Sequence, residues 1–456
     1  ETEGWRCCRP FSCRGRWLNE PRLLLLDRSS RENDAAMNQK KLVTAQVDAD
    51  GRMIFPPEIA ARFGIKPGTE VHLEEGNNEI RLLRPTSHLA KVYIEPTNLC
   101  NLDCRTCMRN VWGESAGTMS DQTFERIFES IKSISPLPTV FFGGYGEPLI
   151  HPKVIEWAKR FKELGARVEL ITNGLLLTEE KALRFIRMGL DMLWVSLDGS
   201  SPESYADVRL GSSLPKVIEN LKTLRRIRYK ATDIDNTKPN LGIAFVAMKD
   251  NIADLPEVIQ LGISLGAKQF SISNVLAHTP ELYEQILYQR VVFNTTTRLS
   301  ESLPLVNLPR MDSNALTKDV LAEIYARRYR LELAGFETNR AVDSCPFIEQ
   351  GSTSIRWDGS VCPCLPLLHT NQNYFAKRLR HSQAHTVGNI LEKDLLGIWE
   401  DSNYADLRRR IQRFDFSPCT FCNGCQLSTN NEEDCLGNSG LACGGCLWAQ
   451  GVIRCP

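Results

Sequence analysis

Between residues 90 and 300, strand-like segments alternate with helix-like segments, and this alternation constrains the fold more than any other feature. The strand-like segments read KVYIE, TVFFGG, ARVELITNG, DMLWVSLDG, NLGIAFVA and KQFSISNV. Mostly apolar strands separated by helices predict a parallel sheet that is covered by helices. We therefore expect an α/β fold of six units, either an open sheet or a partial (β/α)6 barrel.

Two of the intervening segments carry helix boundary signals. Ser120 precedes a stretch of one-face apolar spacing, and serine is a favoured N-cap residue. Thr178 precedes two acidic residues, and Gly189 closes that segment, which is the usual order from helix start to helix end. The residues that share one face of the first helix are Phe124, Ile127, Phe128 and Ile131.

Polar and glycine-rich motifs follow four of the predicted strands directly. A CxxxCxxC motif follows the first strand, FGGYGEP ends the second, TNG ends the third and SLDG ends the fourth. Ligands of parallel α/β sheets lie beyond the carboxyl ends of the strands. We therefore expect these motifs to form one site.

The CxxxCxxC motif contains Cys100, Cys104 and Cys107. A structural zinc site closes with four ligands, usually in two pairs, and no fourth ligand stands nearby in the sequence. Thiolates also hold 4Fe-4S clusters, one thiolate per iron. Three cysteines on one loop would leave one iron open for a substrate or cofactor, which favours a catalytic site over a structural one.

With this triad, the Gly-Gly-x-Gly-Glu-Pro motif and the six-unit repeat, residues 90–300 resemble the radical S-adenosylmethionine (SAM) enzymes. The resemblance implies that the triad binds a 4Fe-4S cluster whose open iron chelates the amino and carboxylate groups of SAM. One electron then cleaves the cofactor reductively to a 5′-deoxyadenosyl radical, which abstracts hydrogen from a substrate. The catalytic residues would be the three cysteines.

The other strand-end motifs suit the binding of SAM. Glycines allow the backbone to approach a ligand closely, and a carboxylate or free carbonyl groups would accept from its ammonium group. Threonine, asparagine and serine offer hydrogen bonds to a ribose. The aspartate in SLDG, Asp198, has capping of the next helix as an equal interpretation. The predicted cofactor-binding residues are Gly143, Gly144, Gly146, Glu147, Thr172, Asn173, Ser196 and Arg209.

One position departs from the family pattern. Relatives usually carry an aromatic residue before the third cysteine, where it packs on adenine, but this chain has Thr106. We expect adenine to pack instead on Met108, or on the fifth and sixth strands around Val246 and Ile272.

A second group of cysteines lies in residues 345–455. The spacing of Cys345, Gly359 and Cys364 resembles the SPASM extension of peptide-modifying radical enzymes, which holds two auxiliary 4Fe-4S clusters. Two such clusters need about eight thiolates, and this region supplies ten. Later spacings depart from the family, so the pairing into clusters stays open, as does a zinc site of two CxxC pairs. The predicted metal ligands here are Cys345, Cys362, Cys364, Cys419, Cys422, Cys425, Cys435, Cys443, Cys446 and Cys455.

Residues 42–85 resemble the AbrB-type swapped-hairpin domains of transition-state regulators. Turn signals at Asp50-Gly51 and Gly76-Asn77 flank a predicted short helix around residues 58–63. Such domains form homodimers by exchanging strands. Arg52 matches a DNA-contacting residue of relatives, but Ala60 and Ala61 replace their basic pair, so DNA binding is disfavoured.

The whole-chain features exclude other classes. The 456 residues contain 55 Lys plus Arg and 55 Asp plus Glu, a balance that favours neither nucleic acid nor anionic membranes. With no apolar run of membrane-spanning length, we expect a cytoplasmic protein without a membrane partner. The predicted parts are an extension at 1–36 that is disordered or wrongly assigned, the AbrB-like domain at 37–87, the radical core at 88–300, a helical linker at 301–344 and the SPASM-like domain at 345–456.

Taken together, residues 37–456 resemble the radical SAM maturases of tungsten-pterin aldehyde oxidoreductases. The resemblance implies an enzyme that matures the tungsten cofactor or its host oxidoreductase, with ferredoxin or flavodoxin as electron donor and a protein or peptide as substrate. One alternative is a maturase that modifies ribosomal peptides. Another is a non-enzymatic AbrB-like regulator that binds DNA and senses redox state through its clusters.

Overall fold

The computed structural model describes residues 43–456 except 76–79, 231–236, 295–303, 328, 334–335, 339–341 and 423–424. The expected extension at 1–36 lies outside the described residues. The chain divides into two compact units, Glu1–Pro57 and Glu58–Pro456, which we describe separately.

The described part of the first unit is a small hairpin. Strand β1 (Gln46–Val47) pairs antiparallel with β2 (Met53–Ile54), and Gly51 adopts a φ of 78° in the turn. The predicted turn at Asp50-Gly51 is therefore confirmed. The short helix is confirmed as α2 (Pro57–Phe63). In the second unit β3 (Leu73–Glu75) pairs with β4 (Ile80–Leu82), and the predicted Gly76-Asn77 turn between them lies outside the described residues. The AbrB-like assignment stays a prediction.

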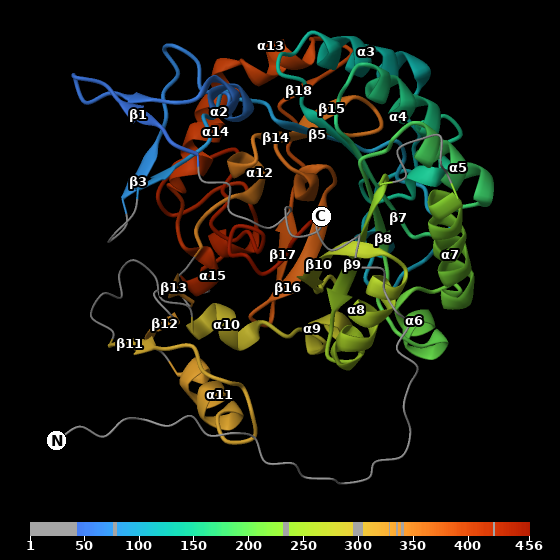
Figure 1. Ribbon diagram of the computed structural model, residues 1–456. Coiled ribbons are helices and arrows are strands. Elements are labelled where there is room, and N and C mark those ends of the chain that lie inside the picture. The colour runs from blue at the N-terminus through green and yellow to red at the C-terminus, as the bar shows by residue number, and fades with distance from the viewer. Residues whose placement is uncertain are drawn as a thin grey trace, which may run out of the picture. The chain divides into compact units, whose positions relative to one another are not determined.

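A mostly parallel sheet forms the centre of the second unit (Figure 1). All six predicted strands are present and pair in chain order, which confirms the α/β core. They are β5 (Lys91–Ile94), β6 (Thr139–Phe142), β7 (Val168–Thr172), β8 (Met192–Ser196), β9 (Asn240–Ala247) and β10 (Ala267–Asn274).

The cysteine-rich region extends this sheet instead of folding apart from it. Strand β14 (Ser352–Ile355) pairs parallel with β5, and β15 (Ser360–Cys362) and β18 (Gly388–Asn389) follow antiparallel. All four residues of β14 are buried. Because β5 would otherwise expose unpaired backbone groups at a sheet edge, β14 satisfies them.

Helices follow the strands of the core, and the two predicted helix starts are confirmed. Ser120 and Thr178 accept hydrogen bonds as N-caps of α3 (Asp121–Lys132) and α5 (Glu179–Arg187), and Gly189 has the positive φ expected at a helix end. The helices are α3 (Asp121–Lys132), α4 (Val154–Glu163), α5 (Glu179–Arg187), α6 (Pro202–Val208), α7 (Leu214–Lys230) and α8 (Leu255–Ser264).

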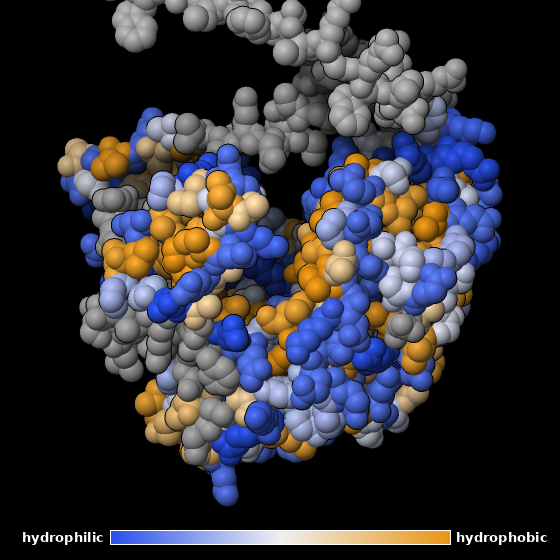
Figure 2. Space-filling view, turned by 90° about the horizontal axis from the view of Figure 1, so that it is seen from below, coloured by the Kyte–Doolittle hydropathy of each residue, from blue (hydrophilic) through white to orange (hydrophobic). Residues whose placement is uncertain are grey.

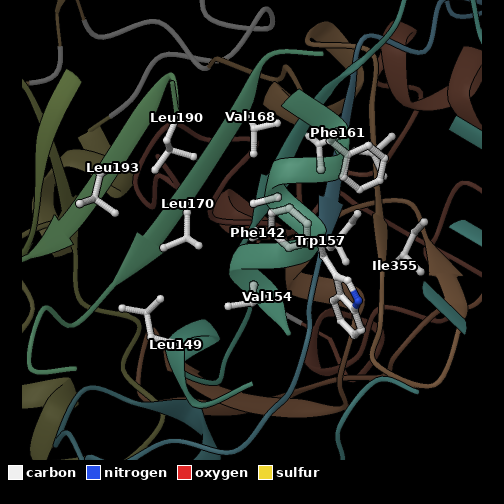
Figure 3. Packing of buried hydrophobic residues seen from close by; sticks show 14 of the residues in the cluster. Phe142, Leu149, Val154, Trp157, Phe161, Val168, Leu170, Leu190, Leu193 and Ile355 are labelled. Atoms are coloured by element: carbon white, nitrogen blue, oxygen red, sulfur yellow. The ribbon is translucent and has the colours of Figure 1, made fainter. Parts of the chain in front are cut away.

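The main hydrophobic core lies between these helices and the sheet. Figure 3 shows Trp157 and Phe161 of α4 beside Phe142 and Val168 of the neighbouring strands. Trp157 stacks on Phe124 of α3 with ring centroids 4.3 Å apart. Burial of one such side chain stabilises the fold by roughly 1.5–3 kcal/mol, so helix-to-sheet packing holds the strand ends in place.

The prediction of a helical linker at 301–344 is wrong for the described residues. Strand β11 (Leu305–Leu308) pairs parallel with β12 (Arg330–Leu333), which pairs antiparallel with β13 (Phe336–Glu337). Only α11 (Lys318–Ala326) is an α-helix there. Prolines at 304 and 309 flank β11 and disfavour helix, whereas the strand pairing is a long-range contact that local patterns do not reveal.

Shorter elements complete the second unit. The α-helices are α9 (Pro280–Glu284), α10 (Gln289–Asn294), α12 (Pro346–Glu349), α13 (Leu395–Trp399), α14 (Ser402–Arg413) and α15 (Cys419–Cys422), and β16 (Asn371–Phe375) forms a hairpin with β17 (Arg378–Ser382). The 3-10 helices are η3 (Met108–Asn110), η4 (Pro148–Ile150), η5 (Ile252–Asp254), η7 (Leu365–Leu367) and η8 (Leu427–Thr429).

The surface has no single uninterrupted hydrophobic area on the face seen in Figure 2, where hydrophobic groups alternate with hydrophilic ones. Among the described residues, no helix combines the length and apolar content that crossing a bilayer requires.

Candidate active site

A cavity of about 310 Å³ lies at the carboxyl ends of the parallel strands. The three triad cysteines line it together with residues from each of the predicted strand-end motifs. The structure thus brings together side chains that are far apart in the sequence. The predicted residues that line the cavity are Cys100, Cys104, Cys107, Gly144, Gly146, Glu147, Thr172, Asn173, Ser196 and Arg209.

The glycines of the second motif serve packing as well as the cavity. A Cβ added at Gly146 would lie 2.1 Å from the carbonyl oxygen of Thr97 and 2.6 Å from that of Leu99. Next to it, the backbone N–H of Glu147 donates to Leu99 O at 2.8 Å. Gly143 lies outside the cavity lining, and its Cβ would meet the Phe141 ring at 2.5 Å. Gly146 therefore allows its loop to lie against the backbone of residues 97–99. From the sequence we expected these glycines to let the backbone approach a ligand.

Two guanidinium groups face the sulfur atoms of the triad. Arg109 Nε donates to Cys107 Sγ at 3.3 Å, and Arg209 Nη1 lies 3.8 Å from Cys104 Sγ. Burial raises the pKa of the Cys104 thiol, and Arg209 opposes that rise. Cations beside thiols favour the thiolate form that binds iron. The role of Arg109 escaped sequence reasoning, although a basic residue two positions after Cys107 was visible.

Arg209 is held in a buried ion pair. Its Nη2 lies 2.6 Å from Oδ2 of Asp198, and the other carboxylate oxygen of Asp198 accepts from Val246 N at 2.7 Å. Although burial lowers the pKa of Arg209, Asp198 and Cys104 raise it above its ordinary value. The interpretation of Asp198 as a helix cap is wrong, because Ser201 caps α6.

Glu147 ties the ends of β6 and β7 together. Its carboxylate accepts from Thr172 Oγ1 at 2.8 Å and from the backbone N–H groups of Asn173 and Leu149 at 2.7 and 3.0 Å. Burial raises its pKa, and these hydrogen bonds oppose the rise. The side chain of Glu147 thus positions the TNG motif, beyond any contact it makes with a ligand.

Several cavity residues come from parts of the chain that the motifs do not mark. Trp448 Nε1 donates to Cys455 Sγ at 3.3 Å, and Asn274 Nδ2 donates to Val452 O at 2.8 Å. These contacts hold the segment 452–456 against β10. No local sequence signal points to them, because they depend on the tertiary fold. The lining outside the motifs includes Ser273, Asn274, Leu365, Trp448 and Ile453, and Tyr145 is an unpredicted lining residue within the second motif.

Only part of the surface on which we expected adenine to pack lines the cavity. Thr106, Met108 and Val246 line the cavity. Ile272 is absent from the lining, although its neighbour Ser273 contributes. Aromatic surface is available in the cavity from Tyr145 and Trp448.

A buried histidine connects the cysteine-rich region to the core loops. His369 Nε2 lies 2.8 Å from Glu95 Oε2, and its other ring nitrogen contacts Glu114. Glu95 also accepts from Tyr145 N at 3.0 Å. Although burial lowers the pKa of His369, its hydrogen bonds to the two glutamates raise it above the ordinary value. His369 therefore connects to the GGYGEP loop through Glu95.

The structure sorts eight of the ten C-terminal cysteines into two groups. The first thiol group consists of Cys345, Cys364, Cys443 and Cys446, which line a second cavity of about 80 Å³. The second thiol group consists of Cys419, of Cys425 and Cys435, whose charges act on its thiol, and of Cys422, which ends the same short helix α15. Burial raises the pKa of Cys345 to about 12, and Cys446 raises it further. Burial likewise raises the pKa of Cys419 to about 11, with contributions from Cys425 and Cys435.

This sorting bears on the predicted ligands. The alternative of one zinc site would use the CxxC pairs Cys419/Cys422 and Cys443/Cys446. These two pairs belong to different thiol groups. Among the described residues, no three His, Cys, Asp or Glu side chains converge as around a single metal ion. Cys362 belongs to neither group, because the charged residues that act on its thiol are Arg356, Asp358 and Glu95. Cys455 lines the first cavity instead.

Two regions of the chain match known protein families. Residues 94–241 match the radical SAM superfamily, and residues 345–426 match SPASM, an iron-sulfur cluster-binding domain.

The chain is also similar to individual proteins. The chain is 31% identical over 370 residues to the tungsten-containing aldehyde ferredoxin oxidoreductase cofactor-modifying protein of Pyrococcus furiosus. The matched residues make up 80% of this chain and 96% of the relative. It is 35% identical over 138 residues to the 7,8-dihydro-6-hydroxymethylpterin dimethyltransferase of Methanocaldococcus jannaschii, covering 28% and 27%. Streptococcus suis SuiB bound to S-adenosylmethionine is a solved structure with a TM-score of 0.47 and 17% identity, over 76% of this chain and 73% of that one.

Proposed function

The chain belongs to the radical SAM superfamily and is an enzyme of its SPASM-containing branch, and from this premise we propose that it modifies the cofactor of a tungsten-containing oxidoreductase or the protein that hosts it. The observation that carries the proposal is the similarity to the Pyrococcus furiosus cofactor-modifying protein, which extends over 80% of this chain. The 370 matched residues exceed the length of the segment from residue 94 to residue 426 that carries both family matches.

The donor set in the first cavity fits the expected cofactors. Three thiols from one loop supply ligands for three irons of a 4Fe-4S cluster and leave the fourth iron for SAM. The neighbouring guanidinium groups of Arg109 and Arg209 stabilise negative charge at Cys107 and Cys104. The polar groups of Thr172, Asn173 and Ser196 on the same cavity suit a ribose and an amino acid moiety.

When both are bound, the cluster and SAM supply a carbon-centred radical that takes a hydrogen atom from the substrate. The protein's own contribution is to position these groups and to exclude water. Glu147 orients Thr172 and Asn173, and Asp198 orients Arg209 toward Cys104. Tyr145 and Trp448 provide apolar walls on the same cavity, and a water-poor site protects a reactive radical from side reactions.

We assign the two C-terminal thiol groups as sites for auxiliary 4Fe-4S clusters. Each group supplies four thiols, the number that a fully ligated cluster requires. This assignment leaves Cys362 and Cys455 without an auxiliary cluster. An electron donor of the ferredoxin or flavodoxin class would reduce the clusters, and strand exchange through the N-terminal hairpins would form a homodimer.

The proposal is tested by anaerobic reconstitution followed by incubation with dithionite and SAM. We expect about twelve irons per chain, as three four-iron clusters require, and release of 5′-deoxyadenosine. A fully loaded protein that releases no 5′-deoxyadenosine would contradict the enzymatic proposal.

Substrate identity needs a second experiment. The reconstituted enzyme is incubated with an immature tungsten-dependent aldehyde oxidoreductase, and the cofactor and the polypeptide are then analysed separately by mass spectrometry. A mass change on either component that depends on SAM supports the proposal. Unchanged masses on both, with SAM cleavage intact, would count against this substrate and favour a peptide.

A further inference from the structure

Arg380 is a buried cation in the hairpin formed by β16 and β17. Arg380 is 5% exposed, and its guanidinium lies 4.4 Å from the centre of the Phe375 ring. Nη1 donates to Gly445 O at 3.3 Å and Nη2 donates to Cys419 O at 3.0 Å. Both of these acceptors are neutral carbonyl oxygens.

The charge of Arg380 has no carboxylate partner in the described part of the chain. The charged groups that act on it are Cys419 and Arg378, and burial lowers its pKa to about 10. Arg209, which is largely buried, has Asp198 at 2.6 Å. A buried cation without a counter-charge is costly, so natural proteins pair such groups with an anion or a metal-bound anion.

A second buried arginine, Arg408, has more aromatic contact than Arg380 has. Arg408 is also buried, and the groups that act on its charge in the described part of the chain are Tyr404 and Arg409. Its guanidinium lies 3.7 Å from the Trp399 ring and 4.3 Å from the Tyr404 ring. Two aromatic faces partly compensate that charge. Arg380 has one aromatic face, and its other contacts are the carbonyl oxygens of Gly445 and Cys419.

Arg380 lies where the two thiol groups meet. It lines the cavity that holds the first thiol group, and it donates to Cys419 of the second. Gly445 belongs to the loop between Cys443 and Cys446, and its Cβ position lies 3.3 Å from Arg380 Nη1 and 3.8 Å from Cys419 Cβ. One cation therefore touches a backbone segment of each group.

From this juxtaposition we propose that Arg380 is the shared counter-charge of two auxiliary iron–sulfur sites and raises their reduction potentials. Four thiolates around a four-iron cluster leave a net negative charge that increases on reduction. A fixed cation at short range stabilises the reduced form more than the oxidised form, and little solvent is present to screen it. The inference rests on the proposed assignment of the thiol groups as cluster sites.

The test measures midpoint potentials in the full-length, anaerobically reconstituted protein. A background variant with Cys100, Cys104 and Cys107 replaced by alanine removes the triad signal and leaves the auxiliary clusters. In that background Arg380→Met removes the charge, Arg380→Lys keeps it, and Arg408→Met is the control for loss of a buried arginine elsewhere. Potentials come from redox titration followed by electron paramagnetic resonance, with iron and sulfide content measured in parallel.

We expect Arg380→Met to lower the ratio of reduced to oxidised auxiliary cluster about tenfold at a fixed applied potential, which corresponds to about 59 mV for a one-electron couple. Arg380→Lys and Arg408→Met should keep the parent potentials. Unchanged potentials in a fully loaded Arg380→Met protein would overturn the proposal, as would an equal shift in Arg408→Met.

Two further outcomes are also decisive. If Arg380→Met loses auxiliary iron, retention of iron and of the parent potentials in Arg380→Lys supports the counter-charge. Loss of iron in both variants would overturn it, because the hydrogen bonds to the carbonyl groups, and not the charge, would then hold the loops. Absence of auxiliary iron in the parent protein would instead refute the assignment of the thiol groups under the proposed function.

Discussion

Replacement of Gly146 by alanine should disable the first cavity by moving one loop. The added Cβ would lie 2.1 Å from Thr97 O and 2.6 Å from Leu99 O. Both obstacles are backbone atoms, so no side chain can rotate away. To restore a separation of even 3.0 Å, the loop must retreat by about 1 Å, judged against the 2.1 Å that the present backbone allows.

The magnitude follows from this displacement. Overpacking of a rigid contact costs roughly 1–3 kcal/mol of unfolding free energy. A misplacement of about 1 Å near reacting groups costs on the order of 100-fold in rate. The loop carries Tyr145 and Glu147, which line the cavity. We therefore expect the rate of 5′-deoxyadenosine release to fall by about two orders of magnitude, with iron content maintained.

Gly113→Ala is the matched control, because its Cβ would meet no atom within 4 Å. Release of 5′-deoxyadenosine is followed by chromatography under excess dithionite and SAM, and unfolding by denaturant titration. A Gly146→Ala protein with the rate and stability of Gly113→Ala would refute the steric argument.

Two other predictions concern the triad and the buried histidine. Cys104→Ala should abolish SAM cleavage and lower iron content by about four irons per chain, whereas Cys362→Ala, which lies outside both thiol groups, should change neither quantity. Although burial lowers the pKa of His369, Glu95 and Glu114 raise it in the folded protein. The contribution of the charged His369 to the unfolding free energy is therefore complete below the unfolded pKa of about 6.5. That contribution is lost as pH rises through the folded pKa. His369→Gln should therefore reduce the unfolding free energy by about 3 kcal/mol at pH near 6 and by less at alkaline pH, as measured by denaturant titration.

The outcomes that would contradict these predictions are specific. Loss of iron in Cys362→Ala would show that this cysteine is a ligand. An equal loss of stability at both pH values in His369→Gln would show that packing against Trp112, 4.3 Å away between ring centroids, outweighs the charge of the imidazolium.

The six strands of the core were predictable because each is encoded locally. Apolar runs of strand length and helices with clear caps at Ser120 and Thr178 recur in order, and parallel topology follows from the alternation. Cys100, Cys104 and Cys107 were predictable because all three lie on one short loop. Their spacing alone therefore limits the kind of site they can form.

The tertiary structure decided what depends on distant contacts. The pairing of β14 with β5 joins residues more than 250 positions apart, and no local pattern predicts that contact. The predicted linker at 301–344 contains strands for the same reason. Likewise, the sequence contains ten C-terminal cysteines with spacings that admit many pairings, and only the fold sorts eight of them into two groups.

The same division holds for single residues. The sequence alone determined that glycines and a glutamate follow the second strand, because residue type is local. Only the folded chain shows that Gly146 accommodates the backbone of Thr97, that Glu147 holds Thr172 and that Arg380 is buried beside Cys419. Close packing and the burial of charge arise between segments far apart in the chain, so these roles are set by tertiary structure and not by local sequence.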